Sequence, residues 1–127
     1  MCRIDHGEMI SVLSEGQRRA KKAHKCGECG RTIEPGETYE SVSGIYDGSF
    51  DTYKTCLQCC SVRKWLANVC AGWVYSEVLE EIEEHFYEGY GMWLGRAAVS
   101  MRRKWRKFDG SLMLPMDLPD QLIKTPV

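Results

Sequence analysis

The sequence lacks the features that would place it at once in a familiar class. No run of about 18 apolar residues occurs, so no membrane-spanning helix is expected. The N-terminus has no apolar signal segment, which argues against secretion. No phosphate-binding glycine loop, dinucleotide motif or Ser/His/Asp order is visible. These absences make a binding protein a simpler expectation than a membrane protein or an enzyme.

Excess charge of either sign is also missing, but the charges are strongly segregated. The chain has 127 residues, of which 28% are charged, and its net charge is -1. This average argues against a generic nucleic-acid coat. Residues 14–25 nevertheless carry five cations and one acid, residues 76–88 carry six glutamates, and residues 102–107 carry five cations. Local charged patches are therefore expected despite the neutral total.

Cysteine is abundant, and its spacing predicts a metal site. The seven cysteines are an odd number without a secretion signal, which argues against a disulfide framework. Cys26-x2-Cys29 is followed after 26 residues by Cys56-x2-Cys59. Two such turns can supply the tetrahedron of thiolates that Zn²⁺ prefers. The sequence therefore predicts one structural zinc ion, and four sulfur ligands leave no position for a catalytic water.

Turn and strand signals surround these cysteines. Pro35-Gly36 marks a turn, residues 38–46 and 50–55 read as strands, and Asp47-Gly48 predicts a hairpin between them. A helix is expected from Cys56 to about residue 69. The Cys26-x2-Cys29 turn is called the knuckle here. The order of knuckle, hairpin and helix resembles the treble-clef zinc finger over residues 24–69.

Two stretches carry a further resemblance. His24 to Tyr39 and Tyr53 to Cys59 are similar to small zinc-binding proteins of unassigned function found in phages and prophages. The resemblance implies a viral or mobile-element origin and a bacterial host cytoplasm, and it assigns no activity.

The rest of the chain is expected to be helical before an extended tail. Ser14-x-x-Gln17 fits a capping box and predicts a basic helix over residues 15–23. Ser76 is expected to cap a helix over residues 77–88, and a helix over residues 93–107 follows. The fold class is thus α+β: a small treble-clef module with an N-terminal basic helix and a C-terminal helical hairpin. The expected segments are 1–23, 24–70, 71–108 and an extended tail, 109–127.

The remaining cysteines and histidines are expected mainly in packing roles, with metal binding as an alternative for some of them. Cys60 and Cys70 are expected to pack as small apolar residues, although Cys60 could replace Cys59 as a ligand. Cys2, His6 and His24 form an alternative second metal site, and His24 is alternatively a donor to a ligand sulfur. His85 is expected at a surface or between helices.

The leading interpretation is a non-catalytic, zinc-stabilised protein that binds and modulates a host protein, as an inhibitor of host defence or a takeover factor. The alternative is nucleic-acid binding through helices 15–23 and 93–107; pairing of the acidic helix with the basic one would compete with it. The absence of histidine between Gly30 and Gly72 argues against a His-Asn-His nuclease. No membrane partner or small-molecule substrate is expected. The candidate partner-binding residues are Arg18, Arg19, Lys21, Lys22, Arg102, Arg103, Lys104, Arg106, Glu80, Glu81 and Glu84.

Overall fold

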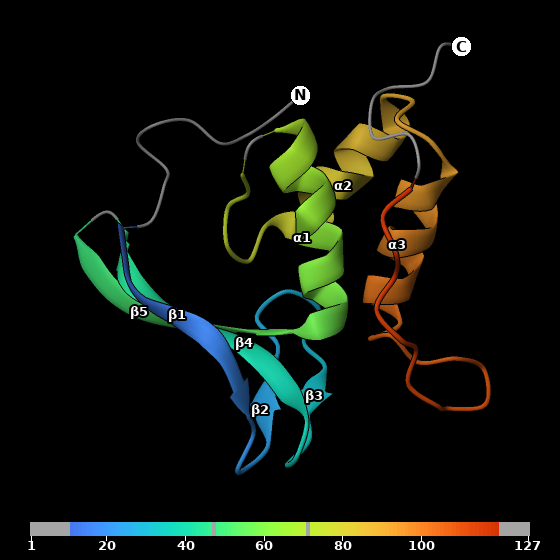
Figure 1. Ribbon diagram of the computed structural model, residues 1–127. Coiled ribbons are helices and arrows are strands. Elements are labelled where there is room, and N and C mark those ends of the chain that lie inside the picture. Colours follow the sequence, from blue (N-terminus) through green and yellow to red (C-terminus); the bar gives the residue numbers. More distant parts are fainter. Residues whose placement is uncertain (1–10, 47, 71, 120–127) are drawn as a thin grey trace.

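The computed structural model describes residues 11–46, 48–70 and 72–119 and shows a small α+β fold (Figure 1). Within these ranges no helix is long and apolar enough to cross a membrane. The elements are β1 (Ser11–Arg19), β2 (His24–Lys25), β3 (Thr32–Ile33), β4 (Thr38–Tyr46), β5 (Ser49–Cys56), α1 (Leu57–Val69), α2 (Val78–Tyr87) and α3 (Met92–Arg102).

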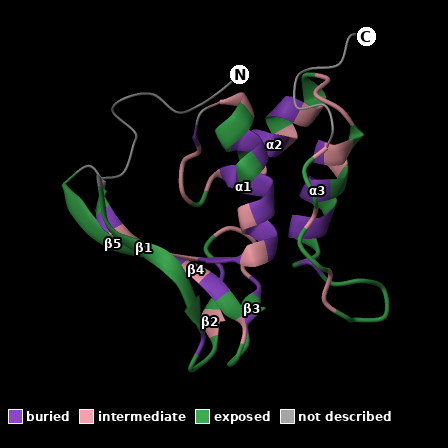
Figure 2. Cartoon of the chain, in the orientation of Figure 1, coloured by how far each residue is buried: buried purple, intermediate pink, exposed green. Residues whose placement is uncertain are grey.

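Two antiparallel sheets form the β part. The larger has the strand order β1-β4-β5, and the smaller pairs β2 with β3. The predicted hairpin is confirmed: β4 and β5 pair from Tyr39 opposite Cys56 to Tyr46 opposite Ser49. The far part of the larger sheet extends away from the helices, and most of its residues there are exposed (Figure 2).

The predicted basic helix over residues 15–23 is wrong: residues 15–19 belong to the edge strand β1, and residues 20–23 form the connection to β2. β1 pairs with β4 from Arg19 opposite Thr38 to Ser11 opposite Ile45, with an irregularity between Val12 and Ser14. The capping-box pattern was misleading. Residues 12–19 of β1 are all exposed, so the strand has no buried face that would produce an alternation of apolar and polar residues. Backbone pairing with the hairpin, a nonlocal interaction, outweighs the local signal.

The core lies where the helices meet the inner end of the sheet. The predicted helix is confirmed as α1, along which Cys59, Val62 and Leu66 are fully buried and Trp65 is 1% exposed. Val78 and Ile82 of α2 and Leu94, Ala97 and Met101 of α3 complete the core. Full burial of a Val, Leu, Ile or Met side chain contributes about 1.5–3 kcal/mol before conformational entropy is counted.

The third helix is shorter than predicted. It ends at Arg102 instead of residue 107, and Lys104 and Trp105 follow with positive φ of 55° and 60°. This turn directs Trp105 into the core, where it is fully buried, and leaves Phe108 96% exposed. Phe108 therefore lies outside the core. A local periodicity cannot reveal a chain reversal that a buried tryptophan stabilises.

The described part of the C-terminal tail is extended across the helices, in front of α3 in Figure 1. Gln58 of α1 donates its amide to the carbonyl of Met113 at 2.9 Å, and Ser61 Oγ accepts the N–H of Met116 at 3.3 Å. Trp93 of α3 donates its indole N–H to the carbonyl of Asp117 at 2.8 Å. Residues 113–117 therefore join α1 to α3.

The start of α2 is capped from a distant part of the chain. The carboxylate of Glu28 accepts the N–H groups of Ser76 at 2.8 Å and Val78 at 3.3 Å. Ser76 has a φ of 70°, the N-cap residue is Glu77, and no side-chain bond from Glu77 caps the helix. The predicted Ser76 cap is therefore wrong, and Glu28 takes its place.

We expect Glu28→Ala to destabilise the fold by about 0.5–2 kcal/mol, the usual range for a lost helix cap. The measurement is urea-induced unfolding of the metal-loaded protein. Glu34→Ala, at an exposed position in the turn before β4, is the matched control and should leave stability unchanged. Equal stability of both variants and the wild type would refute the capping role.

Candidate metal centre

A tight knuckle positions the first two cysteines. Cys26 donates its N–H to the carbonyl of Arg31 at 2.9 Å, and Gly30 donates to the carbonyl of Cys26 at 3.0 Å. Gly30 has a φ of 75°, a conformation that costs glycine little. Gly27 donates its N–H to the carbonyl of Lys54 at 2.9 Å and so ties the knuckle to β5. The two Cys-x2-Cys pairs are thus brought together by backbone hydrogen bonds.

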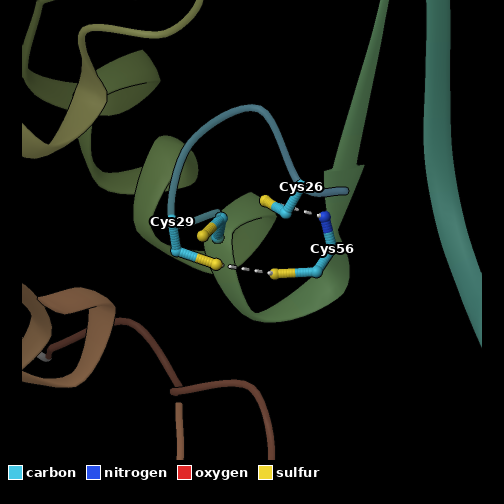
Figure 3. Close-up of side chains that lie close together, drawn as sticks. Cys26, Cys29 and Cys56 are labelled. Atoms are coloured by element: carbon cyan, nitrogen blue, oxygen red, sulfur yellow. Dashed lines mark hydrogen bonds between the residues drawn. The ribbon is translucent and has the colours of Figure 1, made fainter. Parts of the chain in front are cut away.

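The four predicted ligands, Cys26, Cys29, Cys56 and Cys59, converge as the spacing implies. Their sulfur atoms all lie within 4.8 Å of one another, and those of Cys29 and Cys56 are 3.9 Å apart (Figure 3). A tetrahedron with Zn–S distances near 2.3 Å has edges of about 3.8 Å. The group is therefore suited to binding one metal ion, consistent with zinc.

Two nitrogen donors point at the ligand sulfurs. The N–H of Cys56 lies 3.4 Å from Cys26 Sγ, and the indole N–H of Trp105 lies 3.3 Å from Cys59 Sγ. Such bonds favour the charged thiolate and fix its direction. The sequence around Trp105 did not predict this role, because no local pattern indicates a bond to a partner 46 residues away.

The thiols interact too closely to ionise independently. Hydrogen bonds from Cys29, Cys56 and Cys59 lower the pKa of Cys26, whereas bonds to Cys26, Cys29 and Cys56, together with burial, raise the pKa of Cys59. A bare cluster therefore retains protons, and a metal ion must displace them when it binds. Metal affinity is consequently expected to rise with pH.

One basic residue near the ligands, Arg31, is buried and hydrogen-bonded. Arg31, 2% exposed, donates to Glu37 at 3.0 and 3.1 Å and to Gln58 at 3.0 Å. The pKa of Arg31 is raised: burial alone would lower it, but its bond to Glu37 and the nearby Cys56 outweigh that effect. Four thiolates with a bound Zn²⁺ would carry a formal charge of -2, which this guanidinium would help to balance.

The neighbouring Cys60 stays outside the cluster, so Cys59 is confirmed over Cys60 as the fourth candidate ligand. Cys60 Sγ accepts from Arg63 at 3.2 Å, and burial raises the pKa of its thiol to about 12. It is therefore a poor nucleophile at neutral pH, in keeping with the expected packing role.

The structure also locates the other histidines and cysteines among the described residues. The ring of His24 lies 5.2 Å from that of Tyr39. Cys2 and His6 of the alternative second site lie outside the described residues. A cluster that the sequence analysis missed consists of Cys70, Glu81 and His85, whose ligand atoms lie within 4.8 Å of one another. The spacing of Glu81 and His85 by four on a helix was the available signal.

The prediction for Glu81 is wrong. Glu81 was a candidate for partner binding on the acidic helix, but it is fully buried, as is His85. The side chain lies on the inner face of α2 with His85, so it cannot meet a partner at the surface. Glu80 and Glu84 lie on the exposed side of the same helix.

The N-terminal basic residues surround one hollow of about 700 Å³. We call it the basic hollow; it is lined by Arg18, Arg19, Lys21, Lys22, His24 and Tyr39. Partial burial and then the positive charges of Lys54 and Lys22 lower the pKa of His24. A second hollow shares His24 and adds Lys25 and Lys54. Four predicted binding residues are therefore brought together, although on a strand and turn instead of a helix.

The C-terminal basic residues are engaged locally instead. Arg102 pairs with Glu83 of α2 through bonds of 2.7 and 2.8 Å, as expected if the acidic and basic helices satisfy each other. Arg103 lies over the ring of Phe108 at 4.2 Å, and Arg106 donates to the carbonyl of Gly110 at 3.3 Å. Lys104 is exposed in the turn after α3.

Metal removal tests the centre directly. We expect Cys56→Ser, or chelation of the metal from the wild type, to unfold at least residues 24–69, because metal binding supplies about 10–16 kcal/mol in small zinc modules. Far-UV circular dichroism and thermal unfolding report the loss. Cys60→Ser is the matched control, since it removes a nearby thiol outside the cluster. An unchanged spectrum after complete metal removal would contradict a structural metal.

Trp105→Phe tests the indole–sulfur bond while keeping an aromatic ring. We expect a loss of about 1.5–3 kcal/mol, the range for hydrogen bonds to charged groups, together with weaker metal binding. Unfolding in urea and competition with a chelator measure the two effects. Trp73→Phe is the control, because the indole N–H of Trp73 has no partner among the described residues. Metal affinity equal to that of the wild type in the Trp105 variant would remove this role.

Comparison with known proteins gives no family for this chain. No protein-family model matches it. Searches of curated proteins and of solved structures likewise found no match.

Proposed function

We propose that the protein is a non-catalytic, zinc-stabilised module that binds nucleic acid through its basic hollow. The observation that carries the proposal is the convergence of Arg18, Arg19, Lys21 and Lys22 around one concavity beside the metal knuckle. Phosphate contacts from lysine and arginine supply most of the nonspecific affinity for nucleic acids. The nucleic-acid alternative is therefore placed ahead of the host-protein interpretation.

Charge around the hollow favours an anionic partner. The four basic side chains are exposed, and none forms an ion pair with an acid in the part of the chain that the structure describes. The nearby acids Glu37 and Glu40 are bonded to Arg31 and Arg63 respectively. Lys25 and Lys54 continue the positive surface across the second hollow. The local field is thus positive although the net charge is near zero.

The metal would act structurally. Four sulfur ligands complete a tetrahedral shell, so a bound Zn²⁺ would have no open position for substrate or water. β2 leads directly into Cys26, and the basic hollow borders β2 at His24. Zinc therefore supports the hollow by holding the knuckle. The order of knuckle, hairpin and helix also supports the treble-clef assignment as part of this proposal.

A protein partner is the second candidate, favoured by an apolar hollow of about 690 Å³ beside α3. Phe86, Met92, Trp93 and Val99 contribute to its lining, and Met92 is 77% and Val99 58% exposed. Exposed apolar concavities of this kind often mark protein contacts. The phage origin, the host partner and the bacterial cytoplasm remain predictions from the resemblance.

Arg18→Ala/Lys22→Ala tests the basic hollow. We expect weaker binding of fluorescent single-stranded and duplex oligonucleotides, and a logarithmic salt slope smaller by about 1.4–1.8, as for two lost phosphate contacts. Fluorescence anisotropy at several salt concentrations measures both quantities. Arg103→Ala/Lys107→Ala removes the same charge from the other basic segment and should change little.

Two outcomes would overturn the nucleic-acid proposal. One is the absence of binding by the metal-loaded wild type at low salt. The other is equal binding by the wild type and the Arg18/Lys22 variant. A crosslinked protein partner lost in Val99→Asp but retained in Arg18→Ala/Lys22→Ala would then favour the apolar hollow.

A further inference from the structure

Three side chains of metal-binding type meet away from the four-cysteine centre. Cys70 ends α1, while Glu81 and His85 lie on the inner face of α2. Glu81 and His85 are both fully buried, and Cys70 is half-buried. The three ligand atoms lie within 4.8 Å of one another. A carboxylate, an imidazole and a sulfur thus share one interior position.

The imidazole is oriented as in a metal ligand. His85 Nδ1 lies 2.8 Å from the carbonyl oxygen of Glu81, so Nδ1 carries the proton and donates. The other nitrogen, Nε2, then presents its lone pair, and it lies 3.4 Å from Cys70 Sγ. Ligating histidines commonly donate their second nitrogen to a carbonyl in this manner. In a tetrahedral zinc site, sulfur and imidazole nitrogen are separated by about 3.5 Å.

Cys70 also sets a condition, because it is disulfide-bonded in the structure. Its sulfur becomes a metal ligand only when that bond is reduced. A phosphine reductant cleaves the S–S bond to two thiols, and the phosphine becomes its oxide with oxygen from water. The Cys70 thiol then gives up its proton when the metal binds.

We propose that, in the reduced protein, Cys70, Glu81 and His85 form a second metal site that binds Zn²⁺ and links the end of α1 to α2. Sulfur, nitrogen and carboxylate ligands in one small site suit zinc and not Mg²⁺ or Ca²⁺, which require mostly oxygen. The site is separate from the four-cysteine centre and independent of the proposed nucleic-acid binding.

Metal stoichiometry tests the site in the untagged 127-residue chain. Oxidised and phosphine-reduced samples are loaded with Zn²⁺ and freed of excess metal. Elemental mass spectrometry then measures the number of zinc ions per chain. We expect two ions per chain after reduction and one before it. His85→Gln and Glu81→Gln should each return the reduced protein to one ion, whereas Cys60→Ser should keep two. One ion per chain in the reduced wild type, or two in the His85 variant, would overturn the proposal.

X-ray absorption at the zinc edge decides the case without a variant, should either one fail to fold. The reduced wild type is compared at one and at two equivalents of Zn²⁺. The second equivalent should add nitrogen and oxygen scattering near 2.0 Å to the sulfur shell near 2.3 Å. A shell of sulfur alone at both loadings would exclude the site.

Discussion

The convergence of four thiols is the constraint on which the remaining structure depends. β5 ends at Cys56, α1 contains Cys59, and the knuckle provides the other two sulfurs. Four anionic sulfurs cannot share such a volume without a cation to offset their repulsion. A metal ion bound by the four sulfurs would therefore set how the hairpin leaves the knuckle and where the first helix begins.

The helical part is attached to this centre by bonds of long sequence separation. Glu28, between the two knuckle cysteines, caps α2, and Trp105, after α3, donates to Cys59. Burial raises the pKa of Glu28 to about 7, although the N–H groups of Ser76 and Val78 act in the opposite direction. Knuckle and helices are consequently linked, so loss of a bound metal ion would also remove support from α2 and α3.

The charged segments of the sequence are arranged in three different ways in the fold. Glu83 and Arg102 pair with each other between α2 and α3, and Glu81 is buried close to His85. The cations of β1 and the following turn gather around the basic hollow. A net charge near zero thus combines an internal balance on one side of the molecule with a positive surface on the other.

The sequence by itself determined the ligand set, the hairpin and the first helix, because each rests on short-range chemistry: two Cys-x2-Cys turns, an Asp-Gly turn and a helical apolar period. Only the tertiary structure decided that residues 11–19 form a strand, since their pairing with β4 is nonlocal and leaves no buried face. It alone also decided the inward turn at Trp105 and the meeting of Cys70 with His85. Those positions depend on contacts between distant segments, which no local spacing encodes.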